Sequence, residues 1–182
     1  TGSGSDAASG ITWAADSGAK ILNLSFGSED YSSSIHDAIV YARSKDCVVV
    51  AAAGNEGTSL SYPARDPLAF SVGSVSLSGV HSSFSNYGGE LDLTAPGEDL
   101  ISAGHNSNSS YVQASGTSGA AAEVSGMAAL GVIWNSSANS GELMQFLRES
   151  GEKVSGLGSS TYNDYYGWGV ANYERLQTHG EY

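Results

Sequence analysis

Two short segments of the chain carry side chains that could attack a carbonyl group and stabilise the product. Ser118 follows Gly116 and Thr117 at the start of a long stretch rich in Ala, Val and Gly, where a helix would begin. Asn55 lies earlier, after the small residues Ala53 and Gly54. A serine hydroxyl can act as a nucleophile, while its own N–H and an asparagine amide can donate hydrogen bonds to an oxyanion. We therefore expect Ser118 and Asn55 to share one catalytic site.

A nucleophilic serine also needs a base to take its proton. The histidines lie in a predicted helix, two loops and the tail, in contexts unrelated to Ser118: His36, His81, His105 and His179. We expect each of them to be a surface residue rather than a general base. The sequence therefore predicts that the base comes from another segment.

Composition narrows the class of protein. A length of 182 residues suits one domain. Seven Lys and Arg against nineteen Asp and Glu give a net charge of −12, which argues against nucleic acid or an anionic membrane as partner. The acidity fits a soluble protein and is compatible with a cationic substrate.

No apolar run reaches the roughly 18 residues of a membrane span. Few Lys with abundant Ser, Gly, Asn and Tyr are typical of secreted or extracytoplasmic enzymes.

The elements that must position these residues are short apolar strands alternating with helices. Near-continuous apolar runs predict buried parallel strands covered on both faces, at residues 21–26, 47–53, 69–75 and 91–95. Helical spacing or small-residue runs predict helices at residues 6–17, 32–45, 117–134 and 141–149. A further strand is expected near residues 111–114. The expected fold is α/β, with three layers and a mostly parallel sheet, and the lone Cys47 should be a small buried residue.

Ligands of open parallel sheets bind at the carboxyl ends of the strands. Residues 25–27 and 53–55 both follow predicted strands, and Ser118 begins a helix whose free N–H groups favour developing negative charge. We therefore expect these three segments to meet at one edge of the sheet.

Several ordered motifs then resemble those of the subtilisin family of serine proteases, the subtilases. Residues 48–57 (VVVAAAGNEG) resemble the family's oxyanion-asparagine segment, and residues 21–27 (ILNLSFG) its substrate-binding strand. Other matching segments follow in family order: Tyr62-Pro63, 84–88 (FSNYG), 95–97 (APG) and 166–170 (YGWGV). The resemblance covers nearly the whole chain. It implies that residues 1–182 form the C-terminal portion of a single subtilisin-like peptidase domain.

The resemblance also implies a role for each matching residue. Ser118 would be the nucleophile and Asn55 the oxyanion donor, with no cofactor required. The residues that would pair with the backbone of a peptide or protein substrate are Ser25, Phe26 and Gly27. Those that would line the pocket for the residue before the scissile bond are Ala52, Ala53, Gly54 and Ser61, with Glu56 at its rim. The family often has a cis peptide bond at the position of Pro63.

Asp92 aligns with a carboxylate that some subtilases use at a weak cation site, which would hold a structural Ca²⁺ or Na⁺. The alternative is a strand-end Asp whose oxygens are satisfied by backbone N–H groups.

The nucleophile segment departs from the family pattern G-T-S-M-A-S-P-H-V-A-G, since residues 116–126 read GTSGAAAEVSG. Gly119 replaces a bulky, oxidisable Met, which leaves room beside Ser118. Ala122 replaces Pro and should let the helix run straighter. Glu123 replaces a His that is not the catalytic base, and we expect it to be a paired or solvated helix residue.

The family's early H-G-T motif, which carries the catalytic His, does not occur in this sequence, and the one D-[ST]-G string, residues 16–18, ends the predicted helix 6–17 and is not followed by an H-G-T motif. The chain alone should then be inactive, and its sheet should have an unpaired edge. Both features would be explained by a companion that supplies Asp and His, either a cleaved N-terminal chain that stays docked or a separate subunit. Two alternatives are a peptide-binding pseudoprotease and a fragment of an ordinary protease. The missing base and the altered residues 119–123 favour the pseudoprotease, while retention of Ser118 and Asn55 favours the enzyme.

Overall fold

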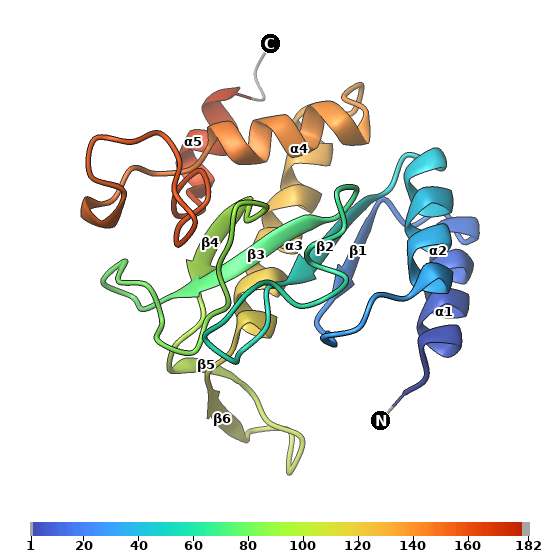
Figure 1. Cartoon of the computed structure of the whole chain (residues 1–182), viewed down its shortest axis with the longest axis horizontal. Helices are drawn as coiled ribbons and strands as arrows, with labels where there is room; N and C mark the ends of the chain where they lie inside the picture. The colour runs from blue at the N-terminus through green and yellow to red at the C-terminus, as the bar shows by residue number, and fades with distance from the viewer. Residues whose placement is uncertain (1, 180–182) are drawn as a thin grey trace.

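A computed structural model describes residues 2–179 and has three layers (Figure 1). A parallel four-stranded sheet, ordered β1-β2-β3-β4, lies between two groups of helices. The strands of this sheet are β1 (Ile21–Leu24), β2 (Val48–Ala52), β3 (Phe70–Val75) and β4 (Leu93–Pro96). One face is covered by α1 (Gly4–Asp16) and α2 (Ser33–Ser44). The other is covered by α3 (Thr117–Trp134), α4 (Ser140–Glu149) and α5 (Tyr173–His179).

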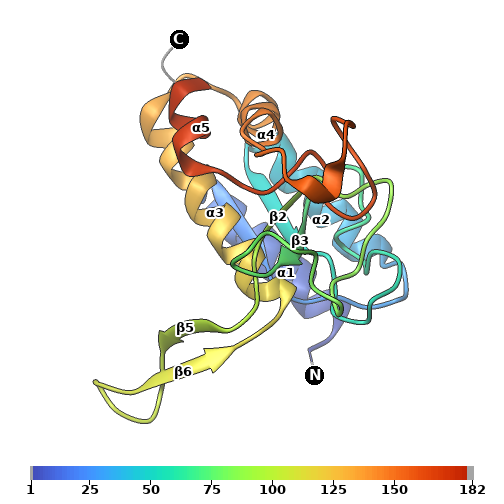
Figure 2. The ribbon, with the colours of Figure 1, turned by 90° about the vertical axis from the view of Figure 1, so that its left-hand side faces the viewer.

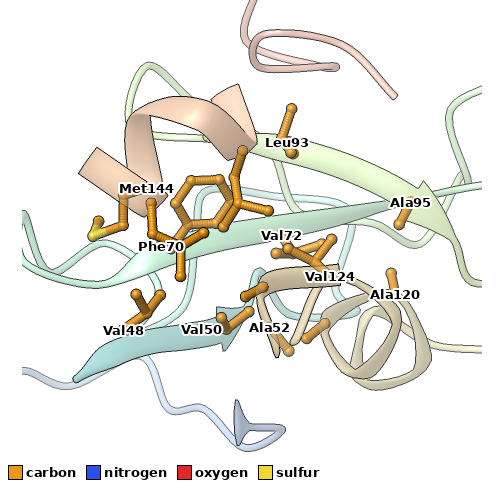
Figure 3. Packing of buried hydrophobic residues seen from close by; sticks show 14 of the residues in the cluster. Val48, Val50, Ala52, Phe70, Val72, Leu93, Ala95, Ala120, Val124 and Met144 are labelled. Atoms are coloured by element: carbon orange, nitrogen blue, oxygen red, sulfur yellow. The ribbon is translucent and has the colours of Figure 1, made fainter. Parts of the chain in front are cut away.

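The alternating directions of side chains along β2 explain why its sequence is apolar throughout. Val48, Val50 and Ala52 point to the α3 side, where they pack against β3 and α3 (Figure 3). Val49 and Ala51 point to the α1–α2 side. Every residue of β2 is buried, as expected for a strand covered on both faces. The predicted α/β class is thus confirmed, and each strand end lies within about two residues of its prediction.

Two further expectations about single residues are met. Cys47 is fully buried, and its thiol donates to the backbone oxygen of Ala19 over 3.0 Å. Burial raises the pKa of this thiol, so it stays protonated and packs as an apolar group. The Tyr62-Pro63 peptide bond is cis.

The two edges of the sheet differ. Along β4, the backbone N–H of Thr94 donates to Gly169 over 3.0 Å, and the N–H of Ala171 donates to Thr94 over 2.7 Å, so this edge is covered. Among residues 2–179, no strand pairs with the outer side of β1. The predicted unpaired edge is therefore at β1, directly before the exposed segment 25–27.

A β-hairpin projects beyond the layers, as Figure 2 shows. It is formed by β5 (Leu100–Ala103) and β6 (Tyr111–Ala114), which pair in antiparallel register. The sequence predicted β6 but neither β5, α5 nor the short 3-10 helix Ser155–Leu157. Ile101 is 75% exposed and Tyr111 76%, so the hairpin lacks the buried apolar face from which strands are recognised.

Candidate active site

Ser118 is the second residue of α3, at the end of the helix that meets the hairpin. The N-cap residue Gly116 has no side chain to bond the first N–H groups of the helix. Its own N–H donates to Gly97 over 2.7 Å, and a Cβ at Gly97 would come within 2.9 Å of the Gly116 oxygen. Glycine at residue 97 therefore permits the close approach that fixes the start of α3.

Asn55 is held against this helix start by Thr117. Its Oδ1 accepts from the N–H of Thr117 over 2.9 Å and from the Thr117 hydroxyl over 3.0 Å. The hydroxyl oxygen of Thr117 in turn accepts from the N–H of Gly54 over 3.2 Å. Because Oδ1 faces two donors, the amide nitrogen is directed away from Thr117. Asn55 therefore presents a donor group at the start of α3, as an oxyanion site requires.

Two pockets meet at this pair of residues. The first, here called the inner pocket, has a volume of about 120 Å³ and adjoins the end of β1. Its walls come from Ser25, Phe26, Gly27, Ala52, Gly54, Asn55, Glu56, Ser61, Thr117 and Ser118. The structure thus brings Ser118 and Asn55 together with nearly all the residues predicted for substrate binding. Ser25 also bonds the nucleophile's segment directly, since its hydroxyl donates to the Ser118 carbonyl oxygen over 3.1 Å.

Ala53 is an exception that corrects the predicted lining. It is fully buried and packs with Leu60 and Leu91, away from the inner pocket. The reason is the alternation of side chains at the end of an extended segment, which turns Ala53 away when Ala52 faces the pocket.

Glu56 has a larger role than a position at the rim. Its Oε2 accepts from the N–H of Asn55 over 3.0 Å, from the Asn86 amide over 2.8 Å and from the Ser61 hydroxyl over 3.4 Å. The space for this network depends on Gly54, where a Cβ would come within 2.2 Å of Asn86 Nδ2. Sequence reasoning assigned no role to Asn86, although it lies within the quoted motif 84–88, and it missed the role of Thr117.

The second pocket, here called the hairpin pocket, lies between α3 and the β5–β6 hairpin and measures about 400 Å³. Its walls come from Asn55, Leu100, Ile101, Ser102, Ala114, Ser115, Gly116, Ser118, Gly119, Ala122 and Glu123. A Cβ at Gly119 would lie 2.5 Å from Leu100 Cδ1, so Leu100 fills the room that the missing side chain leaves. Helix α3 continues unbroken through Ala122, where the family pattern has Pro.

Glu123 faces this pocket. Of the expected paired or solvated helix residue, the structure shows the solvated one, because Glu123 is exposed and its carboxylate has no hydrogen bond or ion pair to the rest of residues 2–179. Although the residue is exposed overall, partial burial among its neighbours raises the pKa of its carboxyl group. A charge with no partner thus lies on α3, one and a half turns beyond Ser118.

Asp92 is occupied by partners within the chain. Its Oδ1 accepts from Arg148 Nε over 2.6 Å, and its Oδ2 accepts from the N–H of Ser71 over 2.8 Å. Burial raises the pKa of Asp92, and Arg148 opposes that shift. The structure thus matches the alternative given for Asp92, a strand-end carboxylate satisfied by a backbone N–H, and adds an ion pair with Arg148. In the described part of the chain no three His, Cys, Asp or Glu side chains gather as a metal site would require.

The Arg148–Asp92 pair should make a measurable contribution to stability. The Asp92 side chain is 10% exposed, so the change Arg148→Met would leave a buried carboxylate without its counter-charge. We expect the free energy of unfolding to fall by about 3 kcal/mol in urea titrations. The double variant Arg148→Met with Asp92→Asn, which removes both charges, should lose less. Equal losses in the two variants would contradict this role of the ion pair.

No histidine lines either of the pockets beside Ser118, and two of the histidines are not simple surface residues. His36 Nδ1 lies 2.7 Å from Oδ2 of the buried Asp66, and this hydrogen bond raises the pKa of His36. His81 packs against Tyr165 with ring centroids 5.2 Å apart, and burial lowers the pKa of His81. Its Nε2 is buried without a hydrogen-bond partner among residues 2–179. His105 is exposed as expected, and the side chain of His179 lies outside the described part.

These opposite shifts predict opposite effects of pH on stability. His36 binds its proton more tightly when folded, so its contribution is fully present below the unfolded pKa of about 6.5 and is lost as pH rises through the folded pKa. His81 binds its proton more weakly when folded, so stability is lost as pH falls below about 6.5. In urea titrations on both sides of neutrality, His81→Phe should remove part of the acid loss, whereas His36→Ala should remove part of the loss on the alkaline side. Parallel pH profiles of both variants and the parent would refute this assignment.

The comparisons with known proteins agree with this geometry. Residues 1–169 match peptidase S8, described as the subtilase family. The chain is 40% identical over 160 residues to a thermophilic serine proteinase of Bacillus sp. strain AK1, covering 87% of this chain and 39% of that protein. It is 39% identical over 153 residues to thermitase of Thermoactinomyces vulgaris, covering 84% and 53%.

A solved structure of a protease from Pseudoalteromonas arctica superposes with a TM-score of 0.88 at 28% identity, covering 98% of this chain and 59% of that one. The chain thus spans about half the length of the curated relatives it matches. No helix of residues 2–179 is both long and apolar enough to cross a membrane. The family match over nearly the whole sequence, together with the relatives' identity, means that this chain belongs to the subtilase family.

Proposed function

We propose that this chain carries the nucleophile of a serine endopeptidase, with Ser118 forming the acyl-enzyme and Asn55 binding the oxyanion. The observation that carries the proposal is the fixed amide of Asn55, whose oxygen is held by Thr117 and which lines both of the pockets that Ser118 lines. A binding protein would need neither a hydroxyl nor a donor at this point. Membership of the subtilase family supports the same reaction class.

In the proposed reaction, Ser118 Oγ attacks the peptide carbonyl carbon while its proton passes to the imidazole of the companion. The carbonyl oxygen becomes an oxyanion, which accepts hydrogen bonds from Asn55 Nδ2 and the Ser118 N–H at the start of α3. The C–N bond then breaks, and the imidazolium returns the proton to the leaving amine. Water hydrolyses the resulting ester by the same steps in reverse order. No step requires a cofactor.

The acyl part of the substrate would bind at the end of β1. Ser25, Phe26 and Gly27 are exposed beside the inner pocket, so an extended peptide can pair with them as an added strand. The residue before the scissile bond would then place its side chain in the inner pocket. This places its carbonyl carbon between the inner pocket and the hairpin pocket, next to Ser118.

The catalytic Asp and His would come from a companion segment or chain that docks on the unpaired edge of β1. Support comes from the absence of an H-G-T motif, from the position of the one D-[ST]-G string, residues 16–18, at the end of α1, and from the open edge itself. We also propose a secreted or extracytoplasmic location, supported by the composition of the chain. An intact-mass measurement of the purified native material should reveal the companion as covalently continuous sequence or as a second species.

Labelling with a fluorophosphonate tests the enzyme against a second candidate function, a peptide-binding pseudoprotease. The pseudoprotease is favoured by the absence of any histidine from the walls of either pocket. In the native assembly, the enzyme must be modified at Ser118, and the change Ser118→Ala must abolish the label. An intact assembly that stays unlabelled would refute the enzyme and leave the binding function.

A further inference from the structure

The hairpin pocket has a composition that suits one kind of side chain. Near Ser118 its walls are aliphatic, contributed by Leu100, Ile101, Ala114 and Ala122. Glu123 adds a carboxylate that has no partner among residues 2–179. A long side chain with an aliphatic stem and a cationic end, such as Lys or Arg, would satisfy both features.

The position of the pocket indicates which part of a substrate would enter it. Ser118 and Asn55 line both pockets and therefore lie at their junction. The peptide extends in two directions from the carbonyl carbon under attack. If its acyl part occupies the inner pocket and the edge of β1, its leaving-group part must pass the opposite side of Ser118, where the hairpin pocket opens.

We propose that the hairpin pocket receives the side chain of the first residue after the scissile bond, and that Glu123 selects Lys or Arg there. This inference rests on the proposed endopeptidase function and adds to it a class of cleavage site. It gives Glu123 a role in specificity rather than in the chemical step.

The environment of Glu123 makes such selection effective. The carboxyl group lines the hairpin pocket, and partial burial there raises its pKa although the residue is exposed overall. A cation brought beside it would restore part of the solvation that this burial removes and would be screened less than on an open surface. The net charge of −12 would also attract cationic peptides to the molecule.

The small residues at positions 119 and 122 make the carboxylate accessible. Gly119 has no side chain to project into the pocket, and the single methyl group of Ala122 lies between Ser118 and Glu123 along α3. Leu100 packs over Gly119 and closes the side toward the hairpin. The departures of residues 119–123 from the family pattern would thus form one channel from the nucleophile to a charge.

The test compares two fluorogenic peptides that differ only in the first residue after the scissile bond, Lys in one and norleucine in the other. The readout is the ratio of their kcat/KM values with the native assembly, from which any general loss of activity cancels. We expect a ratio of about 10 for the parent assembly. Glu123→Gln should lower the ratio to about 1, and Glu123→Lys should invert it. The matched control Glu149→Gln, on α4 and outside both pockets, should keep the parent ratio.

Two results would overturn the inference. The first is a parent ratio near 1, and the second is a ratio that Glu123→Gln leaves unchanged. If that unchanged ratio is accompanied by weaker retention of the companion, Glu123 belongs to the interface with the companion instead. Failure of the proposed function is distinguishable from both results, because then neither peptide is cleaved and Ser118 stays unlabelled.

Discussion

Adding the companion that supplies Asp and His to the isolated chain should raise kcat for peptide hydrolysis by about 10⁶-fold, the size of the loss measured when the serine or histidine of subtilisin, a member of the same family, is removed. The physical reason is that Ser118 and its base act as one unit. Without a proton acceptor the hydroxyl is a weak nucleophile, however well Asn55 is placed. The measurement is steady-state hydrolysis of a fluorogenic peptide by the isolated chain and by the assembly.

The matched control is the assembly that carries Ser118→Ala. Since either defect alone removes the nucleophilic mechanism, this variant should be about as slow as the isolated chain, and the two defects together should be no slower. Substantial activity of the isolated chain would contradict the requirement for an imported base. So would an assembly in which Ser118→Ala retains most of the rate.

The layers of the fold and the strands of its parallel sheet could be predicted because buried strands and helices have recognisable apolar patterns in the sequence. The run of apolar residues in β2 indicates a strand covered on both faces, and the small residues of α3 indicate a helix packed closely on the sheet. The sequence of β5 has no such apolar pattern. Its side chains are largely exposed, and its pairing with β6 depends on a loop between them that no apolar periodicity reveals.

The predictable part of the site consists of residues next to the ends of strands and helices. Asn55 follows the end of β2, and Ser118 lies in the first turn of α3. The topology of a parallel sheet brings such points together. The supporting contacts were not predictable. The bonds of Glu56 to Asn86 and of Asn55 to Thr117 join residues about 30 and 60 positions apart, and nothing in the local sequence indicates which polar groups meet.

Replacing Asn55 by Ala in the assembled enzyme should lower kcat by on the order of 10²–10³, the loss found for the oxyanion asparagine of subtilisin, while KM changes little. KM should stay nearly unchanged because the amide donates mainly to charge that develops in the transition state.

The Asn55→Ala variant also removes the acceptor for Thr117, so Thr117→Val is the matched control for positioning alone. That change deletes the hydroxyl contacts to Asn55 and Gly54 but keeps the backbone bond from Thr117 to Asn55. It should cost much less than Asn55→Ala in steady-state assays. If the two losses in kcat were equal, the role of Asn55 would be to hold the start of α3, and the oxyanion would have to be bound elsewhere.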